Sequence, residues 1–288
     1  MKKDPKVFII ILNYNGKGYL TETLSSVFRL DYPNFEVIVV DNNSIDGSLE
    51  IAKSRFSKVV FIKNNQNLGF AAGNNIGIKY ALERAADYIL LLNNDTQVKN
   101  DFLILLIKAM EGDKKIGISS PLIFKNNISQ VWFSGGKINW LKMKTLHKKE
   151  KLQEDYFGSD FISGCAMLIK SKVFKKVGLL DKDYFLYWED VDFSIKTKKA
   201  GYKLLVSPRS QIYHFEKSEN QKNNKTYWLV ISGLLFFKKN TPFYLKPWIF
   251  IYILARKIKN QLDVHFYEKE IALIVQKAYH DFNTNHLT

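Results

Sequence analysis

The sequence predicts a doubly wound α/β fold: a mainly parallel, Rossmann-like sheet flanked by helices, with a helical appendage at the C-terminus. Short apolar runs rich in β-branched residues recur four times in the first hundred residues, separated by segments with apolar residues at helical spacing. Strands buried on both faces of a parallel sheet have this continuous apolar character. The alternation of strand and helix predicts right-handed βαβ units.

The N-terminal half supplies the regular part of this pattern. Its predicted strands are Val7–Leu12, Val37–Val40, Val59–Ile62 and Tyr88–Leu92. Apolar side chains three and four residues apart predict the helices between them, which fall near residues 20–28, 49–56 and 70–85.

The second half predicts a less regular continuation. Helices are expected after Asp101, near residues 173–177, and from about Asp190 to a point before Gly201. Strands are expected at Ile116–Ser119, Phe161–Ile169 and, as the last of them, Lys203–Val206, and Ile212-Tyr-His214 follows after Pro208. Residues 122–160 have the composition of a loop, which either covers a substrate or is a plain surface insertion.

The composition indicates which cellular compartment and which classes of partner suit this protein. The net charge of +15 favours a polyanionic partner, such as nucleic acid, an anionic membrane or a phosphorylated substrate. The single cysteine, Cys165, excludes an intramolecular disulfide and suits a reducing compartment. No signal peptide is visible before the first strand, so a cytoplasmic location is expected.

Polar residues follow three of the predicted strands directly. Asp41, Asn67 and Asp95 each come just after a strand, so they should converge at the edge of the sheet where ligands bind. Asp95 could hold a hard divalent cation, or belong to an Asx turn. Asp41 could bind a base or ribose, or cap the next helix, although Asp46 is better placed for capping.

Known nucleotide-binding motifs are missing. The sequence has no Walker A pattern, and Gly16-Lys17-Gly18 lacks the third glycine of the dinucleotide fingerprint. A P-loop enzyme and a hydride-transfer enzyme are therefore disfavoured.

A second polar cluster lies at residues 184–192, where aromatic residues precede three acids. An aromatic wall can stack a sugar ring, and one of the adjacent acids Glu189 and Asp190 can accept a hydroxyl proton. Acids in a first helical turn also complement the helix dipole, which is the preferred interpretation for Asp192. The same dipole is expected to lower the pKa of Asp190. His214 is the available second ligand for a metal at Asp95.

These motifs in this order resemble family-2 glycosyltransferases, most closely their bacterial rhamnosyltransferase and galactofuranosyltransferase-like branch. The resemblance covers about residues 6–218 and rests on Leu12-Asn-Tyr-Asn, Val40-Asp-Asn-Asn-Ser, Asn67-Leu-Gly-Phe-Ala-Ala-Gly-Asn-Asn, Leu92-Asn-Asn-Asp-Thr, Ser163-Gly, Tyr187-Trp-Glu-Asp-Val-Asp-Phe, Gly201-Tyr and His214. It implies a GT-A fold, an inverting mechanism, a dTDP- or UDP-linked sugar donor, Mg²⁺ or Mn²⁺, and a glycan or lipid-linked acceptor.

The resemblance also implies roles for individual residues. Asp190, in the pair with Glu189, matches the general base, and Asp95 and His214 match metal-binding positions. The implied nucleotide-sugar contacts are Asn13, Asp41, Asn67, Gly69, Asn74 and Asn94. Asn93 stands where the family has the first acid of its Asp-x-Asp motif, which leaves one fewer negative charge for the cation.

The resemblance divides the chain into a catalytic domain and an appendage. Residues 1–218 form the expected domain, with a nucleotide-sugar half to about residue 112 and an acceptor half from 113. Beyond it, the apolar runs Tyr227–Phe237 and Phe243–Ala255 are too short to span a bilayer. Their flanking lysines predict helices that lie on an anionic membrane at its cytoplasmic face, while packing against the catalytic domain and a dimer contact stay open as alternatives. A last amphipathic helix is expected at Glu268–Phe282.

Two other functions compete with the glycosyltransferase hypothesis. A sugar nucleotidyltransferase shares a related sheet and metal site, but usually has a Gly-rich basic loop after the first strand, which Asn13-Tyr-Asn-Gly16 does not match. A non-catalytic module that binds polyanions or membranes would fit the charge, and Trp132 and Trp140 among lysines would suit single-stranded nucleic acid. It leaves the ordered acidic motifs unexplained, so no nucleic-acid partner is expected.

Overall fold

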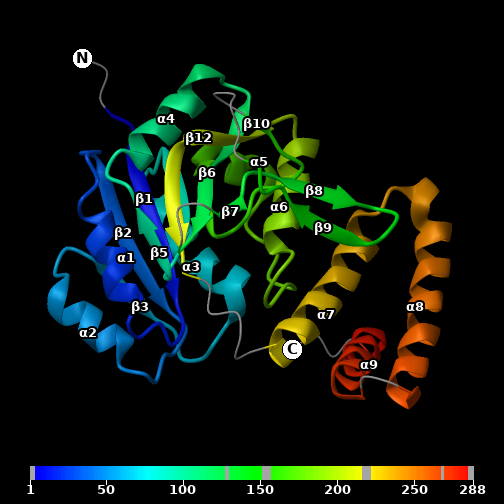
Figure 1. Cartoon of the computed structure of the whole chain (residues 1–288). Coiled ribbons are helices and arrows are strands. Elements are labelled where there is room, and N and C mark those ends of the chain that lie inside the picture. Colours follow the sequence, from blue (N-terminus) through cyan, green and yellow to red (C-terminus); the bar gives the residue numbers. More distant parts are fainter. Residues whose placement is uncertain (1–3, 127–129, 151–156, 216–221, 267–268, 285–288) are drawn as a thin grey trace.

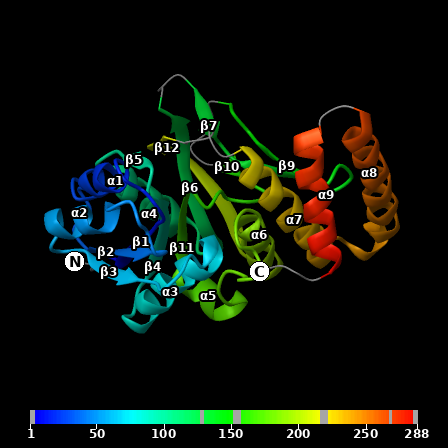
Figure 2. The same ribbon diagram turned by 90° about the horizontal axis from the view of Figure 1, so that it is seen from below.

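The computed structural model describes residues 4–126, 130–150, 157–215, 222–266 and 269–284. Its main sheet has the strand order β10 (Phe157–Gly158), β12 (Lys203–His214), β6 (Ile116–Lys125), β11 (Ala166–Lys170), β4 (Tyr88–Asn93), β1 (Val7–Asn13), β2 (Phe35–Asp41), β3 (Val60–Lys63). Helices cover both faces, with α1 (Leu20–Val27) and α2 (Ser48–Arg55) on one face and α3 (Gly69–Glu83) and α5 (Ser171–Val177) on the other (Figure 2). The predicted mainly parallel α/β architecture is confirmed.

The N-terminal half follows the predicted βαβ pattern. Its strands are parallel neighbours: β1 (Val7–Asn13), β2 (Phe35–Asp41), β3 (Val60–Lys63) and β4 (Tyr88–Asn93). The crossover helices are α1 (Leu20–Val27), α2 (Ser48–Arg55) and α3 (Gly69–Glu83). The apolar runs of β1 and β4 are almost wholly buried, as expected for central strands covered on both faces.

Helix α3 packs closely on the sheet because it carries glycines where it crosses β1. A Cβ at Gly77 would lie 2.7 Å from Cγ2 of Ile10, and one at Gly73 would lie 2.5 Å from Cδ1 of Leu12. Side chains at these positions would push the helix outward. The glycines therefore fix the depth at which the start of α3 meets the carboxyl ends of the strands.

The second half is a mixed continuation of the same sheet. After β5 (Thr96–Val98) and α4 (Phe102–Gly112), β6 (Ile116–Lys125) and β12 (Lys203–His214) run parallel to each other. Strand β11 (Ala166–Lys170) lies antiparallel between β4 and β6. Helices α5 (Ser171–Val177) and α6 (Glu189–Lys199) precede β12.

Three expectations for this half need correction. The strand predicted at Phe161–Ile169 begins only at Ala166, because the preceding residues form a loop against α6. The last predicted strand, Lys203–Val206, is longer than expected: β12 continues to His214, with a register shift between Ser207 and Gln211 around Pro208. A proline lacks the N–H that a regular ladder needs, but a sheet tolerates it at such an irregularity.

The region from 122 to 160 is not simply a loop. Strand β6 continues to Lys125 and pairs with β7 (Val131–Phe133), and β10 (Phe157–Gly158) pairs with β12. Strands β8 (Gly136–Asn139) and β9 (Lys144–His147) form a separate antiparallel ribbon. The four-residue strands β8 and β9 are half-exposed, and β7 and β10 have only three and two residues, so none of the four has the apolar run that marks a central strand.

The C-terminal segment is helical, as predicted, with α7 (Lys222–Asn240), η1 (Phe243–Leu245), α8 (Lys246–Phe266) and α9 (Lys269–Asn283). Helix α7 lies between the sheet and α8 in both views (Figures 1 and 2). Phe236 and Phe237 of α7 are fully buried against the catalytic part of the chain. No helix within the described ranges is long and apolar enough to cross a bilayer. The predicted boundary at residue 218 falls outside the described residues.

Candidate active site

A cavity of about 830 Å³ opens at the carboxyl ends of β1 and β4. The predicted site residues that line it are Asn67, Gly69, Asn94, Asp95, Glu189, Asp190 and His214. They come from four separate parts of the chain, and the parallel sheet gathers several of them at one edge. Three other predicted residues, Asn13, Asp41 and Asn74, lie behind the wall.

Asp41 and Asn13 are buried and bonded to each other. Nδ2 of Asn13 donates to Oδ1 of Asp41 over 2.8 Å, and Ser44 donates to the same carboxylate from its backbone N–H and its hydroxyl. On its other side, Oδ1 of Asn13 accepts a 2.8 Å bond from Nδ2 of Asn94. In this arrangement Asp41 joins β1 to β2, and Asn13 holds Asn94 at the cavity wall.

Asn42 faces the cavity beside Asp41, and reasoning from the sequence overlooked it. Its amide donates to Oδ1 of Asn67 and to the carbonyl of Gly69, and accepts from Nδ2 of Asn64. Consecutive amides after a strand were the available signal, but a sequence does not say which of two neighbours points outward.

The turn before α3 contacts the loop that precedes α6. Gly69 has a φ of 77°, and a Cβ there would lie 2.3 Å from the carbonyl oxygen of Phe185. The next residue, Phe70, donates its backbone N–H to that same oxygen over 2.7 Å. Asn74 donates to the carbonyl of Phe70 and so shapes this turn from inside the helix. Only glycine combines this conformation with so close an approach.

Asp95 and His214 meet in the wall of the same cavity. Strand β12 pairs His214 with Thr96 of β5, which brings Nε2 of His214 to 3.2 Å from Oδ1 of Asp95. That oxygen is buried and makes no hydrogen bond within the described part of the chain. Burial by itself lowers the pKa of His214, but Cys165 and Asp95 outweigh it and raise the pKa well above its usual value.

These two side chains fit a divalent cation. Two ligands about 2.1 Å from one ion, at a right angle, are about 3 Å apart, which matches the Asp95–His214 separation. Among the residues described, no group of three or more His, Cys, Asp or Glu side chains could hold a metal ion. Any cation here would take its remaining ligands from substrate oxygens and water.

Asp190 is held at the start of α6 by the loop before β11. The backbone N–H of Gly164 donates to its Oδ2 over 2.8 Å. The two residues before α6, Tyr187 and Trp188, have φ values of 67° and 72°. Such left-handed conformations are strained for non-glycine residues and concentrate at functional sites.

The expectation for the pKa of Asp190 was wrong. Burial raises this pKa, although the backbone N–H groups of Gly164 and Val191 oppose the increase. The helix dipole is a local effect of the first turn, whereas loss of solvent penalises the charged carboxylate as a whole. Glu189 is more deeply buried, and burial together with the charge of Asp190 raises its pKa well above normal. Glu189 therefore holds its proton more readily than an ordinary glutamate.

Asp192 has a structural role. Its carboxylate accepts from Nζ of Lys196 over 2.6 Å and from Nδ2 of Asn240 over 2.8 Å. The side chain is 1% exposed and does not reach the cavity. It connects α6 to α7.

Helix α7 packs on the loop before Asp190 and forms hydrogen bonds with it. Nε1 of Trp188 donates to the carbonyl of Leu229 over 3.1 Å, and Oγ of Ser232 donates to the carbonyl of Leu186 over 2.8 Å. Trp228 stacks on Phe185, with ring centroids 4.4 Å apart, and lines the cavity. Part of the predicted appendage therefore belongs to the wall of the site.

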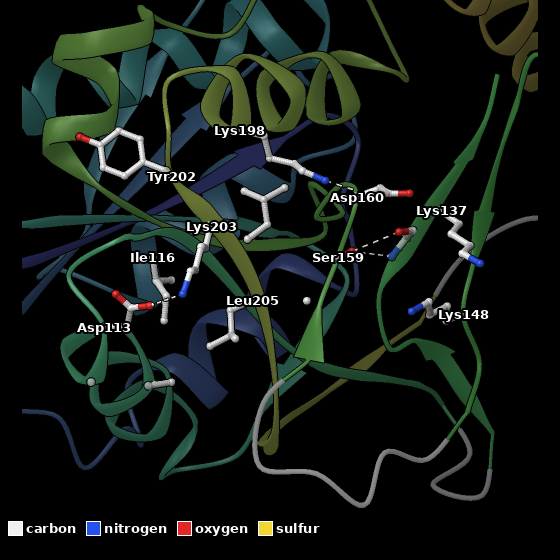
Figure 3. A pocket seen from close by; sticks show the side chains of 15 residues that line it. Asp113, Ile116, Lys137, Lys148, Ser159, Asp160, Lys198, Tyr202, Lys203 and Leu205 are labelled. Atoms are coloured by element: carbon white, nitrogen blue, oxygen red, sulfur yellow. Dashed lines mark hydrogen bonds and ion pairs between the residues drawn. The ribbon is translucent and has the colours of Figure 1, made fainter.

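A second cavity, of about 710 Å³, lies between α4, α6 and the start of β12 (Figure 3). Its acids are paired with lysines: Asp113 with Lys203 at 2.8 Å, and Asp160 with Lys198 at 3.2 Å. None of the predicted site residues lines it. The cavity at the strand ends is the candidate active site.

The order of the motifs and their convergence on one cavity agree with the comparison with known families. The family model "Glycosyl transferase family 2" matches residues 8–178, more than half of the chain. This chain belongs to that family. It is therefore a glycosyltransferase, and the predicted resemblance is confirmed.

Two relatives of this glycosyltransferase are rhamnosyltransferases. Rhamnosyltransferase WbbL of Escherichia coli is 27% identical over 229 residues, 75% of this chain and 85% of that protein. N-acetylglucosaminyl-diphospho-decaprenol L-rhamnosyltransferase of Mycobacterium tuberculosis is 24% identical over 230 residues, 72% of this chain and 75% of that protein. Both fit the rhamnosyltransferase-like branch.

The fold has a solved counterpart. The mannosyltransferase PcManGT of Pyrobaculum calidifontis, in complex with GDP-Man and Mn²⁺, superposes with a TM-score of 0.62 at 16% identity. The match covers 98% of this chain and 76% of that one. This glycosyltransferase therefore has the GT-A fold.

Proposed function

We propose that this enzyme is an inverting, metal-dependent glycosyltransferase. It would move a sugar from a nucleoside-diphosphate sugar to a hydroxyl group of a glycan or lipid-linked acceptor in the assembly of a bacterial surface polysaccharide. The observation that carries the proposal is that Asp190 and the Asp95–His214 pair face the same cavity. A base and a site for a diphosphate are thus available to one substrate complex.

Asp190 is the proposed general base. Its carboxylate would take the proton from the acceptor hydroxyl as that oxygen forms a bond to the anomeric carbon, while the bond from that carbon to the diphosphate breaks. A single displacement of this kind inverts the anomeric configuration. The bond from Gly164 fixes the carboxylate, and its raised pKa makes it a stronger base than an ordinary aspartate. Glu189 would support this base as its neutral partner.

Asp95 and His214 are the proposed ligands of Mg²⁺ or Mn²⁺, and the Mn²⁺ in the mannosyltransferase structure supports a divalent ion. When bound, such an ion would neutralise the negative charge that develops on the departing diphosphate. Asn93 supplies no charge here, so the protein would give the ion one carboxylate. The diphosphate itself would then provide a large part of the coordination.

The wall formed by Asn42, Asn67, Gly69 and Asn94 is the proposed donor side. Its backbone and amide groups suit the ribose and diphosphate of a dTDP- or UDP-linked sugar. Asp41, with Asn13 and Asn74, would support this wall from behind, and Asp41 would reach the nucleotide only if its bonds to Ser44 opened.

The aromatic side chains on the loop before α6 and on α7 are the proposed acceptor side. Phe185 and Trp228 present a stacked aromatic surface there, which suits the face of a sugar ring. Lys225 of α7 lines the same cavity and would favour an acceptor that carries phosphate. A lipid-linked acceptor would place the enzyme at the cytoplasmic face of the membrane.

A product assay tests the proposed reaction. The enzyme is incubated with Mn²⁺ and a panel of dTDP- and UDP-sugars, after thermal-shift screening has selected the donors that raise the melting temperature. The expected product is a nucleoside diphosphate together with a glycosylated acceptor of inverted anomeric configuration. Release of pyrophosphate instead would favour a sugar nucleotidyltransferase, and a retained configuration would refute the inverting mechanism.

A further inference from the structure

Helix α8 exposes a continuous apolar stripe on its outer side. Its members recur every three or four residues, so they share one face, and each is 50–65% exposed: Ile251, Leu254, Ile258, Leu262 and Phe266. We call this set the α8 stripe. The opposite side of the helix packs on α9, where Nδ2 of Asn260 donates to the carbonyl of Ala272.

Aromatic residues extend the stripe at the N-terminal end of α8. Phe243, Tyr244 and Phe250 are each at least 68% exposed. Nearby, Nε1 of Trp248 donates to the carbonyl of Leu141, at the turn between β8 and β9. The side chain of Leu141 is itself exposed. The apolar surface thus continues from the N-terminal end of α8 to the tip of the β8–β9 ribbon. This ribbon points toward α7 and α8 in Figure 1.

The α8 stripe and its aromatic neighbours place eight exposed apolar side chains in one region. Contiguous apolar patches of more than a few hundred Å² are uncommon on monomeric soluble proteins and mark interaction sites, so a partner is expected. The charges around this region identify the kind of partner. The charged residues of α8 are Lys246, Arg256, Lys257, Lys259 and Asp263, four cations and one acid. That acid already lies 3.3 Å from Nζ of Lys259.

This charge pattern disfavours a second copy of the chain. Pairing two stripes around a twofold axis would bring the basic borders of both helices together with little acidic charge between them. An anionic lipid surface matches both features, since acyl chains accept the apolar stripe and headgroups pair with the lysines. Lys142 and Lys144 at the ribbon tip add to the same positive charge.

We propose that the α8 stripe and its neighbouring aromatic residues insert into the interface of an anionic bilayer, with α8 lying parallel to the membrane plane. This goes beyond the proposed reaction, because it assigns a lipid-binding surface outside the active site. It also orients the enzyme. Strand β9 leads from Lys144 at the ribbon tip to His147, which lines the active-site cavity. Thr145 of β9 also lines the cavity, so at about 3.3 Å per residue the cavity wall begins within about 10 Å of the tip.

Vesicle co-sedimentation of the full chain tests the proposal. Large unilamellar vesicles of phosphatidylcholine with one quarter phosphatidylglycerol are compared with pure phosphatidylcholine vesicles. The wild type is expected to bind the anionic vesicles at least tenfold more strongly, and to lose this preference in high salt. The double variant Leu254→Ser, Ile258→Ser is expected to lower the binding constant at least tenfold, because it removes apolar side chains from the centre of the stripe.

The control variant is Ile104→Ser, which changes a similarly exposed apolar side chain on α4. It should bind vesicles as the wild type does. Both variants are compared with the wild type by circular dichroism and light scattering.

The proposal is overturned if the double variant folds normally and still binds anionic vesicles with wild-type strength. It is also overturned if the wild type is a stable dimer that this variant dissociates, since a second copy would then cover the stripe. Neither result bears on sugar transfer, which the product assay measures separately.

Discussion

The backbone N–H of Gly164 donates a 2.8 Å hydrogen bond to Oδ2 of Asp190 and so connects the loop before β11 to the first turn of α6. The adjacent Glu189 has no such donor on its Oε2 within the described residues and is almost fully buried. Two neighbouring carboxyl groups therefore have different environments, and different roles are expected of them.

Replacing Asp190 with asparagine is expected to lower kcat by a factor of about 10²–10⁴, the usual contribution of a general base. Donor binding should persist, because the proposed donor wall lies on other elements. Release of nucleoside diphosphate and the thermal shift with donor are measured together. The matched variant is Glu189→Gln, which imitates a neutral Glu189 and should keep most of the activity. Normal turnover by Asp190→Asn would rule out this base.

The raised pKa of Asp190 predicts the pH dependence. The carboxyl group must lose its proton to act as a base, so kcat/KM should rise with pH through an apparent pKa above the ordinary aspartate range. If kcat/KM instead rose through an apparent pKa near 4, burial would not raise the pKa of the catalytic carboxyl group. The measurement is a pH profile of kcat/KM for the wild type at saturating metal.

The same shift has a consequence for stability. Because the pKa is higher in the folded state than in the unfolded state, the protonated group stabilises the fold, and this contribution is lost as pH rises through the folded-state pKa. Asp190→Asn should therefore melt at a higher temperature than the wild type at pH 8, and this difference should shrink at pH 4. Since 1 kcal/mol changes the Tm of a chain of this size by about 2 °C, scanning calorimetry can resolve it.

Removal of metal is expected to abolish transfer. Dialysis against EDTA should eliminate activity, and Mn²⁺ or Mg²⁺ should restore it. Asp95→Asn should raise the metal concentration for half-maximal activity at least tenfold, because it removes the one carboxylate near His214. Asp113→Asn, in the second cavity, is the control and should need the same metal concentration as the wild type for half-maximal activity. Full activity in chelator would show that Asp95 and His214 do not form a required metal site.

Gly69→Ala should disturb the contact between the turn before α3 and the loop before α6. A Cβ would collide with the carbonyl of Phe185 in a backbone conformation that favours glycine. We expect a loss of about 1–3 kcal/mol in stability and a higher KM for the donor. Gly112→Ala is the control, because a Cβ there has nothing within 4 Å and its φ is not positive. Equal effects of the two substitutions on donor KM, measured with matched melting curves, would refute the role of this contact.

The sequence predicted the regular half of the fold because central parallel strands leave a local signal. The run at residues 7–12 is apolar at every position, and β1 is found there. The strands between 122 and 160 escaped prediction because an edge strand or a two-stranded ribbon needs no apolar run. The pairing partner of β10, strand β12, also lies far along the chain.

The same distinction applies to the site. Residues at strand ends were found because the topology of a parallel sheet fixes which ends meet, and this gathered Asn67 and Asp95 correctly around one cavity. Which of two adjacent residues faces that cavity depends on side-chain packing, so Asn42 was overlooked beside Asp41. Burial is also a tertiary property, and for that reason the pKa of Asp190 was predicted in the wrong direction.

By itself, then, the sequence determined the family, the alternation of strand and helix, and the residue types available for chemistry, since these depend on local patterns along the chain. Only the tertiary structure decided that Asp95 lies 3.2 Å from His214, that burial outweighs the helix dipole at Asp190, and that α7 belongs to the wall of the site. The physical reason is that distance, desolvation and packing arise between segments far apart in the chain, which a local pattern does not encode.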